Sequence, residues 1–100
     1  MSLSFETFAA SFDDGAPPAE ASAPLVALWW VQRGEWDRAH AIVQDGTDKA
    51  SAWVHAHLHR IEGDLGNATY WYRHAGRPVA QGPLEAERTA IATNLLASSR

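Results

Sequence analysis

Glycine and proline residues divide this chain into segments of helical length, and the positions of these helix-breaking residues limit the fold more than any other feature. Between the breaks, large apolar residues and alanines recur every three or four positions, as at Trp36, Ala39 and Val43, a spacing that His40 shares. No stretch alternates between apolar and polar residues for long enough to indicate a strand. The pattern predicts an all-α domain of about five helices, at residues 24–33, 36–45, 48–62, 65–75 and from 83 onward.

Length, charge and residue usage exclude several classes of protein. One hundred residues, 46% of them hydrophobic, suffice for one domain with a single core. A formal charge of −4 argues against a nucleic-acid-binding protein, which needs a concentrated basic surface. The absence of cysteine excludes disulfides and thiolate chemistry. No apolar run reaches the roughly 20 residues of a membrane span, and the first residues lack the basic region of a secretory signal. We therefore expect a cytoplasmic protein that makes no membrane contact.

The first 23 residues differ in character from the rest. Phe5, Phe8 and Phe12 are spaced for one or two short amphipathic turns. Residues 13–18 then contain two aspartates, a glycine and two prolines, which break any helix. We expect residues 1–23 to form a poorly ordered N-terminal arm and residues 24–100 to form a single helical domain.

Two segments of the chain are similar to each other. Residues 34–39 and 63–68 each contain a glycine, an acidic neighbour, a large apolar residue and then an alanine, and they lie 29 residues apart. Self-similarity at such a period is typical of stacked helical repeats. The glycine permits a sharp turn between two helices, and the alanine lets the paired helices approach closely.

This repeat resembles the tetratricopeptide motif, whose later aromatic, alanine and proline positions are matched here by Trp71, Tyr72, Ala75 and Pro78. The stretch around residues 55–72 is also similar to small uncharacterised bacterial proteins of that type. The resemblance covers residues 24–78 and implies antiparallel helix pairs, with the last helix as a C-terminal cap over the open end. It also implies a groove, lined by the first helix of each pair, that binds a protein or peptide partner.

Three histidines alternate with other residues in the segment 53–62, which reads Trp-Val-His-Ala-His-Leu-His-Arg-Ile-Glu. Residues four apart on a helix share a face, so His55 and His59 lie together, with Glu62 beside them. Two imidazoles and a carboxylate in this arrangement can hold one divalent transition-metal ion. A metal-binding protein or metal-dependent enzyme is therefore the alternative function. The zinc-protease signature is missing, because Ala56 stands where the general-base glutamate would be.

The same histidines also have a purely structural interpretation. In the tetratricopeptide register, His55 and His59 fall at positions that pack against the neighbouring helix. Simple helical periodicity disagrees, because it leaves His55 and His59 outside and buries Val54, His57, Leu58 and Ile61. The sequence leaves both registers open.

The sequence favours a protein-interaction module that uses an aromatic and histidine-bearing helical face. Aromatic side chains and arginine together are typical of a recognition surface. Five tryptophans offer more area than so small a core hides, so some would meet a partner or the second subunit of a homodimer. On this interpretation no cofactor is needed, and Trp53→Ala or Arg60→Ala weakens partner binding without unfolding the protein. The candidate contact residues are Trp30, Trp53, His55, His57, His59, Arg60, Glu62, Tyr70 and Tyr72.

Catalysis receives little support from the sequence. Ser51 has Asp48 three residues before it and His55 four residues after it, a spacing more typical of helix capping than of a catalytic nucleophile. Glycine-rich phosphate loops are missing. The charged pairs Asp37–His40 and Glu85–Arg88 are expected on exposed helix faces. We therefore assign no catalytic residue.

Overall fold

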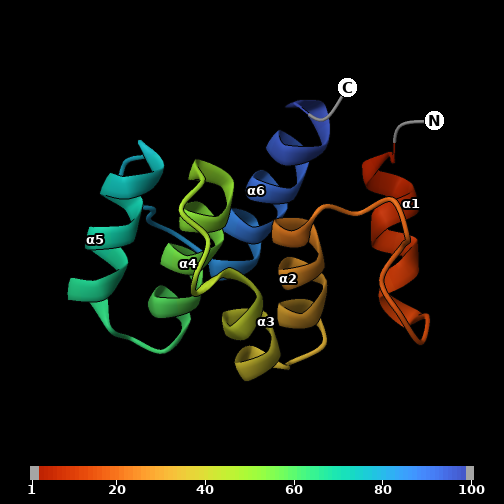
Figure 1. The fold of residues 1–100 in the computed structure, drawn as a ribbon, viewed down its shortest axis with the longest axis horizontal. Coiled ribbons are helices and arrows are strands. Elements are labelled where there is room, and N and C mark those ends of the chain that lie inside the picture. Colours follow the sequence, from red (N-terminus) through yellow and green to blue (C-terminus); the bar gives the residue numbers. More distant parts are fainter. Residues whose placement is uncertain (1–2, 99–100) are drawn as a thin grey trace.

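Six α-helices and one 3₁₀ turn make up residues 3–98, the part of the chain that the computed structural model describes (Figure 1). They are α1 (Phe5–Ala10), the 3₁₀ turn η1 (Ser11–Asp13), α2 (Ala23–Gln32), α3 (Trp36–Val43), α4 (Lys49–Ile61), α5 (Leu65–Ala75) and α6 (Leu84–Ser98). The five helices expected after residue 23 are all present, and their ends agree with the prediction to within about two residues. None of the helices in this part of the chain has the length and apolar character needed to cross a membrane.

The two similar segments of the sequence form the same backbone turn. Gly34 and Gly63 adopt φ angles of 77° and 84°, a left-handed conformation that favours glycine. In both copies the glycine N–H bonds to the carbonyl three residues back, and the next N–H bonds to the carbonyl five residues back. This pair of hydrogen bonds is the Schellman motif, which ends a helix and reverses the chain. The repeat therefore marks the two turns that join α2 to α3 and α4 to α5.

Aspartates begin the two helices of the second pair. The Asp48 carboxylate accepts a hydrogen bond from the Ser51 backbone N–H at 2.9 Å, at the start of α4. The Asp64 carboxylate accepts one from the Asn67 N–H at 3.2 Å, at the start of α5. Each bond satisfies a backbone donor that has no partner inside the helix. The spacing of Asp48 and Ser51 thus reflects the helix cap that the sequence predicts.

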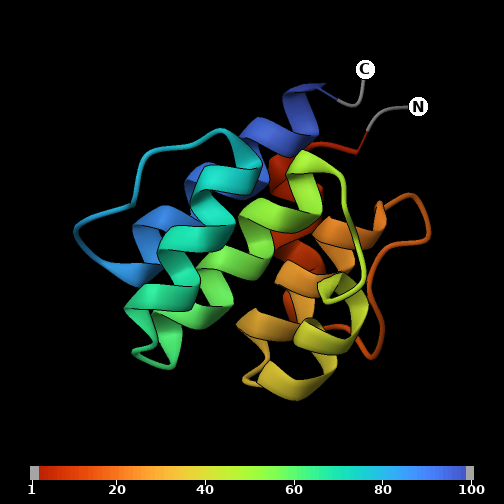
Figure 2. The same cartoon turned by 60° about the vertical axis from the view of Figure 1, so that its left-hand side comes forward.

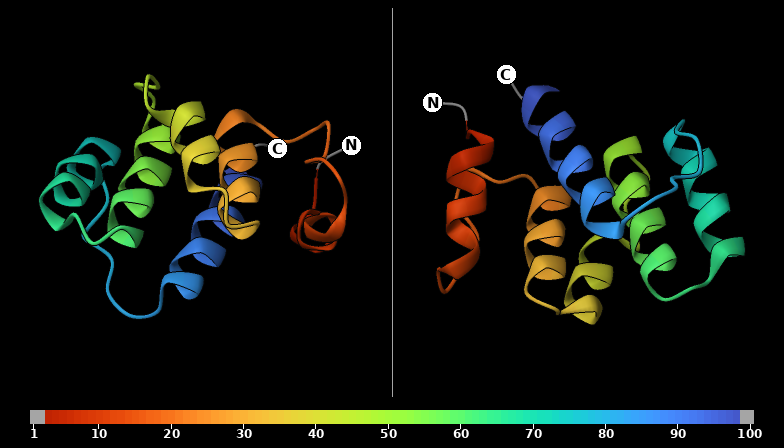
Figure 3. Two further views of the ribbon diagram at one scale, coloured as in Figure 1. Left: turned by 90° about the horizontal axis from the view of Figure 1, so that it is seen from below. Right: turned by 180° about the vertical axis from the view of Figure 1, so that it is seen from behind.

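The helices form two antiparallel pairs, α2 with α3 and α4 with α5, while α6 lies across α2 and α4 (Figures 1 and 3). Helix α1 packs at the opposite end of the molecule from α5, where it contacts α6 (Figure 1). Helix α4 contacts α2, α3, α5 and α6, and Figure 2 shows it running beside α5. Because neighbours surround α4, side chains on more than one of its faces are buried.

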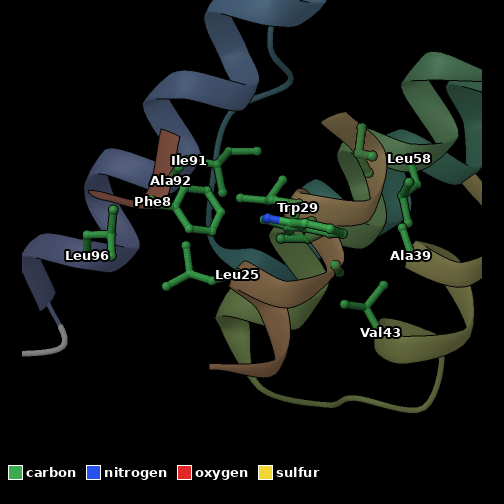
Figure 4. Packing of buried hydrophobic residues seen from close by; sticks show 13 residues of the cluster. Phe8, Leu25, Trp29, Ala39, Val43, Leu58, Ile91, Ala92 and Leu96 are labelled. Carbon is green, nitrogen blue, oxygen red and sulfur yellow. The ribbon is translucent and has the colours of Figure 1, made fainter. Parts of the chain in front are cut away.

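Trp29 lies in the middle of the main hydrophobic core, among side chains from α1, α2, α3, α4 and α6 (Figure 4). Its indole Nε1 donates hydrogen bonds to the carbonyl and the hydroxyl oxygen of Ser11, both at 3.1 Å. Phe8 packs in the same core and is 1% exposed. Residues 5–13, within the segment expected to be a poorly ordered arm, thus supply α1, η1 and part of the core, because the phenylalanine spacing creates an apolar helical face.

Candidate functional site

All three histidines of α4 are buried. His55, His57 and His59 are 4%, 0% and 8% exposed. Both registers considered for the sequence are therefore partly correct, since α4 buries the face that periodicity selects and also the face that carries His55 and His59. The two faces form two separate polar clusters, one with α3 and one with α6.

The first cluster, which we call the histidine cluster, consists of His40 from α3 and of His55 and His59 from α4. One ring nitrogen of each residue lies within 4.8 Å of one from each of the other two. The Nε2 atoms of His40 and His55 are 3.1 Å apart, so one donates a hydrogen bond to the other. The rings of His55 and His59 stack with their centroids 4.8 Å apart.

Two tryptophans flank the histidine cluster and fix its rings. The Trp36 indole stacks on His40 with a centroid separation of 4.8 Å. Its Nε1 donates a hydrogen bond to the Leu58 carbonyl at 2.8 Å, which ties α3 to α4. On the other side, the Trp71 ring of α5 stacks on His55 at 4.1 Å. Elements on both sides of α4 therefore hold the imidazoles in place.

The environment of His40 and His55 favours their neutral form. Burial, together with the neighbouring His59 and His40, lowers the pKa of His55 to about 4. Burial, together with His59, also lowers the pKa of His40. At pH 7 His40 and His55 are thus in the deprotonated form that binds metal ions.

His55 has one ring nitrogen without a partner. Within the described part of the chain, its buried Nδ1 is the only buried side-chain nitrogen or oxygen that lacks a hydrogen bond. An unsatisfied buried polar atom costs about 1–3 kcal/mol. Packing alone therefore leaves half of the hydrogen-bonding capacity of His55 unused.

Glu62 binds the third histidine. The Nδ1–H of His59 donates a hydrogen bond to Glu62 Oε1 at 2.5 Å, which leaves the lone pair of His59 on Nε2. Glu62 also groups with His59 and Asp64 on the exposed side of the cluster. Of the three metal ligands expected from the sequence, the structure brings His55 and His59 together with His40, whereas Glu62 orients His59.

His40 is the member that the sequence interpretation missed, since it was placed with Asp37 on an exposed helix face. The sequence does indicate that His40 faces the core, because His40 lies on the same helix face as Trp36, Ala39 and Val43. The structure shows that this stripe faces the core, with Ala39 and Val43 fully buried and His40 half-buried.

The second cluster, which we call the Glu87 network, joins α4, α5 and α6 around one buried carboxylate. His57 Nδ1 and Arg60 Nη1 donate to Glu87 Oε1 at 2.7 Å and 2.9 Å, and the Tyr72 hydroxyl donates to Oε2. Burial by itself would raise the pKa of Glu87, but the hydrogen bonds from His57 and Tyr72 and the contact with Arg60 outweigh it and hold this pKa below its usual value. The same environment raises the pKa of Tyr72, first through burial and then through Glu87.

Glu87 was not among the residues predicted from the sequence. The sequence position of Glu87 indicates that its side chain is buried, because Glu87 lies three residues after Leu84 and four before Ile91, on the apolar stripe of α6. Arg88 does not pair with Glu85 as expected. Its Nε donates to the side-chain carbonyl of Gln32 at 3.0 Å, so it links α6 to α2.

The predicted contact residues divide into three groups by exposure. His55, His57, His59 and Tyr72 are buried, and Arg60 is half-buried in the Glu87 network. Two tryptophans are half-buried beneath arginine side chains, Trp30 under Arg38 and Trp53 under Arg77. Glu62 and Tyr70 are exposed. The aromatic and histidine-bearing set therefore does not lie on a single surface.

Comparison with known proteins does not assign a function to this site. No known protein family, no characterised protein and no solved structure matches the chain.

Proposed function

We propose that this protein binds one divalent transition-metal ion through His40, His55 and His59. The observation that carries the proposal is the convergence of three imidazole nitrogens to within 4.8 Å of one another. Imidazole is a favoured ligand of zinc, nickel, copper and iron. Three histidines around one ion leave a fourth position for water or another small ligand.

The distances support this ligand set. Ligand atoms 2.0–2.1 Å from a tetrahedral zinc ion lie about 3.3 Å from one another. The Nε2 atoms of His40 and His55, 3.1 Å apart, already have nearly that separation. The third nitrogen needs to approach by no more than about 1.5 Å, which small side-chain rotations provide. The buried Nδ1 of His55 has no partner within residues 3–98, so no hydrogen bond fixes which of its two ring nitrogens carries the single lone pair that an ion would bind.

Glu62 supports the same proposal from outside the ligand set. A histidine that binds a metal usually donates its other N–H to a carboxylate, which fixes the ring and makes the ligand nitrogen more basic. The hydrogen bond from His59 Nδ1 to Glu62 has this form. We assign Glu62 the role of orienting His59.

Calorimetric titration of the metal-free protein, made without an affinity tag, with Zn²⁺ tests the proposal. We expect one equivalent to bind, His40→Gln and His55→Gln to lose that binding, and Glu62→Gln to weaken it by about 10–100-fold. His74→Gln is the matched control, because His74 lies on the exposed face of α5 and stacks on Tyr70 instead. The proposal fails if the wild type shows no saturable binding, or if His74→Gln impairs it as much as His55→Gln.

A protein-interaction module is the second candidate function, and a homodimer or a separate protein partner remains a prediction. This second function is supported by the half-buried Trp53, which lines two adjoining hollows on the surface together with Arg77. We also propose that the two helix pairs are related as tetratricopeptide-like repeats. The equivalent Schellman turns at Gly34 and Gly63 support that relation.

A further inference from the structure

A groove runs beside α6, between this helix, α4 and the connection that follows α5. Two adjoining hollows of about 370 Å³ and 240 Å³ form it, and Trp53 and Arg77 line both. The larger hollow is mainly apolar, with walls from the connection between α5 and α6 and from Ala86 and Ala90 of α6. The smaller hollow lies between the start of α4 and the end of α5 and contains Lys49. The groove thus has an apolar part and a cationic part, which meet at Trp53.

Arg77 lies across the boundary between the two parts. Its guanidinium carbon is 3.9 Å from the centre of the Trp53 ring, a cation–π contact. Its Nη2 donates a hydrogen bond to the side-chain oxygen of Asn94 at 3.2 Å. Both contacts hold the guanidinium at the groove, where its remaining N–H donors are available to a ligand.

The two cations of the groove, Lys49 and Arg77, are not paired with a carboxylate of the described chain. Neither Lys49 nor Arg77 forms an ion pair with another residue of the stretch 3–98. Glu87 lines the larger hollow, but its carboxylate is held by His57, Arg60 and Tyr72. Because the chain as a whole carries a formal charge of −4, two unpaired cations in one groove favour a ligand with negative charge.

The wall of the groove suits an extended peptide. Residues 78–81 are not helical, and within the described residues they make no backbone-to-backbone hydrogen bond. Pro78 has no N–H and the Ala80 N–H bonds to the Tyr72 hydroxyl, so Val79 and Gln81 provide the N–H donors for a peptide. A peptide can pair with such a segment through its main chain and place alternate side chains in the hollows. Val79, which is 47% exposed, offers apolar surface at the same place.

We propose that this groove binds an extended acidic peptide, which places an apolar side chain in the larger hollow and a carboxylate between Lys49 and Arg77. The apolar side chain is covered by Trp53 and by the residues 78–80. This proposal is independent of the metal site, since it uses none of the three histidines.

Fluorescence anisotropy with metal-free protein and two labelled, end-blocked hexapeptides tests the proposal. The first peptide reads glycine, leucine, aspartate, leucine, aspartate, glycine, and the second has asparagine in place of aspartate. We expect saturable binding of the acidic peptide and binding at least about 10-fold weaker for the neutral one, since the carboxylate contacts are lost. Equal affinity for both peptides, or no saturation by the acidic peptide, overturns the proposal.

Three variants locate the binding. Lys49→Gln and Arg77→Gln should each weaken binding of the acidic peptide by at least about 5-fold, since each removes one cation from the groove. Arg73→Gln is the matched control on exposed surface of α5, outside the groove, and should bind as the wild type does. If Lys49→Gln and Arg77→Gln both match Arg73→Gln, with unchanged circular dichroism, the peptide does not bind in this groove.

Discussion

We expect that replacement of Glu87 by alanine lowers the free energy of unfolding by about 3–5 kcal/mol. The carboxylate of Glu87 is buried and accepts hydrogen bonds from His57, Arg60 and Tyr72, which come from two other helices. Its removal leaves a half-buried guanidinium and two buried donors without their acceptor. Breaking a buried charge pair from one side is strongly destabilising for this reason.

Urea denaturation followed by circular dichroism at pH 7 measures this effect. Glu85→Ala is the matched control, because Glu85 is an exposed glutamate in the first turn of the same helix. Its effect should remain within about 0.5 kcal/mol. An equal, small change in both variants would show that the Glu87 network does not hold α6 against α4 and α5.

The second large effect is a dependence of stability on pH that arises from His55. In the folded protein the pKa of His55 is about 4, whereas in the unfolded chain it is near the ordinary histidine value of 6.5. Between these values the unfolded state binds the proton and the folded state does not, so stability falls as the pH is lowered. The metal-free protein should lose up to about 3 kcal/mol of unfolding free energy between pH 6.5 and 4 from this source.

The His55→Phe variant isolates that contribution. Phenylalanine keeps an aromatic ring against Trp71 and carries no titratable nitrogen, so the variant should show a pH dependence that is smaller by about 3 kcal/mol. Urea denaturation in the presence of a chelator, at several pH values from 7 to 4, measures both proteins. Parallel pH profiles would contradict the assignment of a neutral, buried His55. The lowered pKa of Glu87 acts in the same direction, but its stabilisation is present above the unfolded carboxyl pKa of about 4.5 and is lost as the pH falls further.

The helices were predictable because local signals define their ends. Gly34 and Gly63 take left-handed conformations that few other residues adopt, and Asp48 and Asp64 cap the helices that follow. These interactions join residues at most five positions apart. These turn and cap signals can therefore be recognised in the sequence without knowledge of how the helices pack.

The candidate sites were only partly predictable, since each contains contacts between distant residues. His55 and His59 share a helix face, so their spacing alone brings them together. His40 joins them across 15 residues through the packing of α3 on α4, which no local pattern specifies. Arg60 was expected on a contact surface, but it lies against Glu87, which is 27 residues away.

The burial of α4 on several sides is the other feature that local patterns miss. Helical periodicity assumes one buried face and one exposed face. Helix α4 contacts four other helices, so its polar residues His55 and His59 are buried along with Leu58. Polar residues on both sides of a central helix then pair with partners from its neighbours, which only the tertiary structure identifies.

The most direct test of the metal site is a crystal structure of the zinc-loaded protein with anomalous diffraction data on both sides of the zinc absorption edge. We expect one strong peak with ring nitrogens of His40, His55 and His59 at about 2.0–2.1 Å from the ion. Glu62 should remain hydrogen-bonded to His59 and outside the coordination sphere. A map without a peak among these three rings, or with zinc bound only at surface groups such as Asp64 or His74, would contradict it.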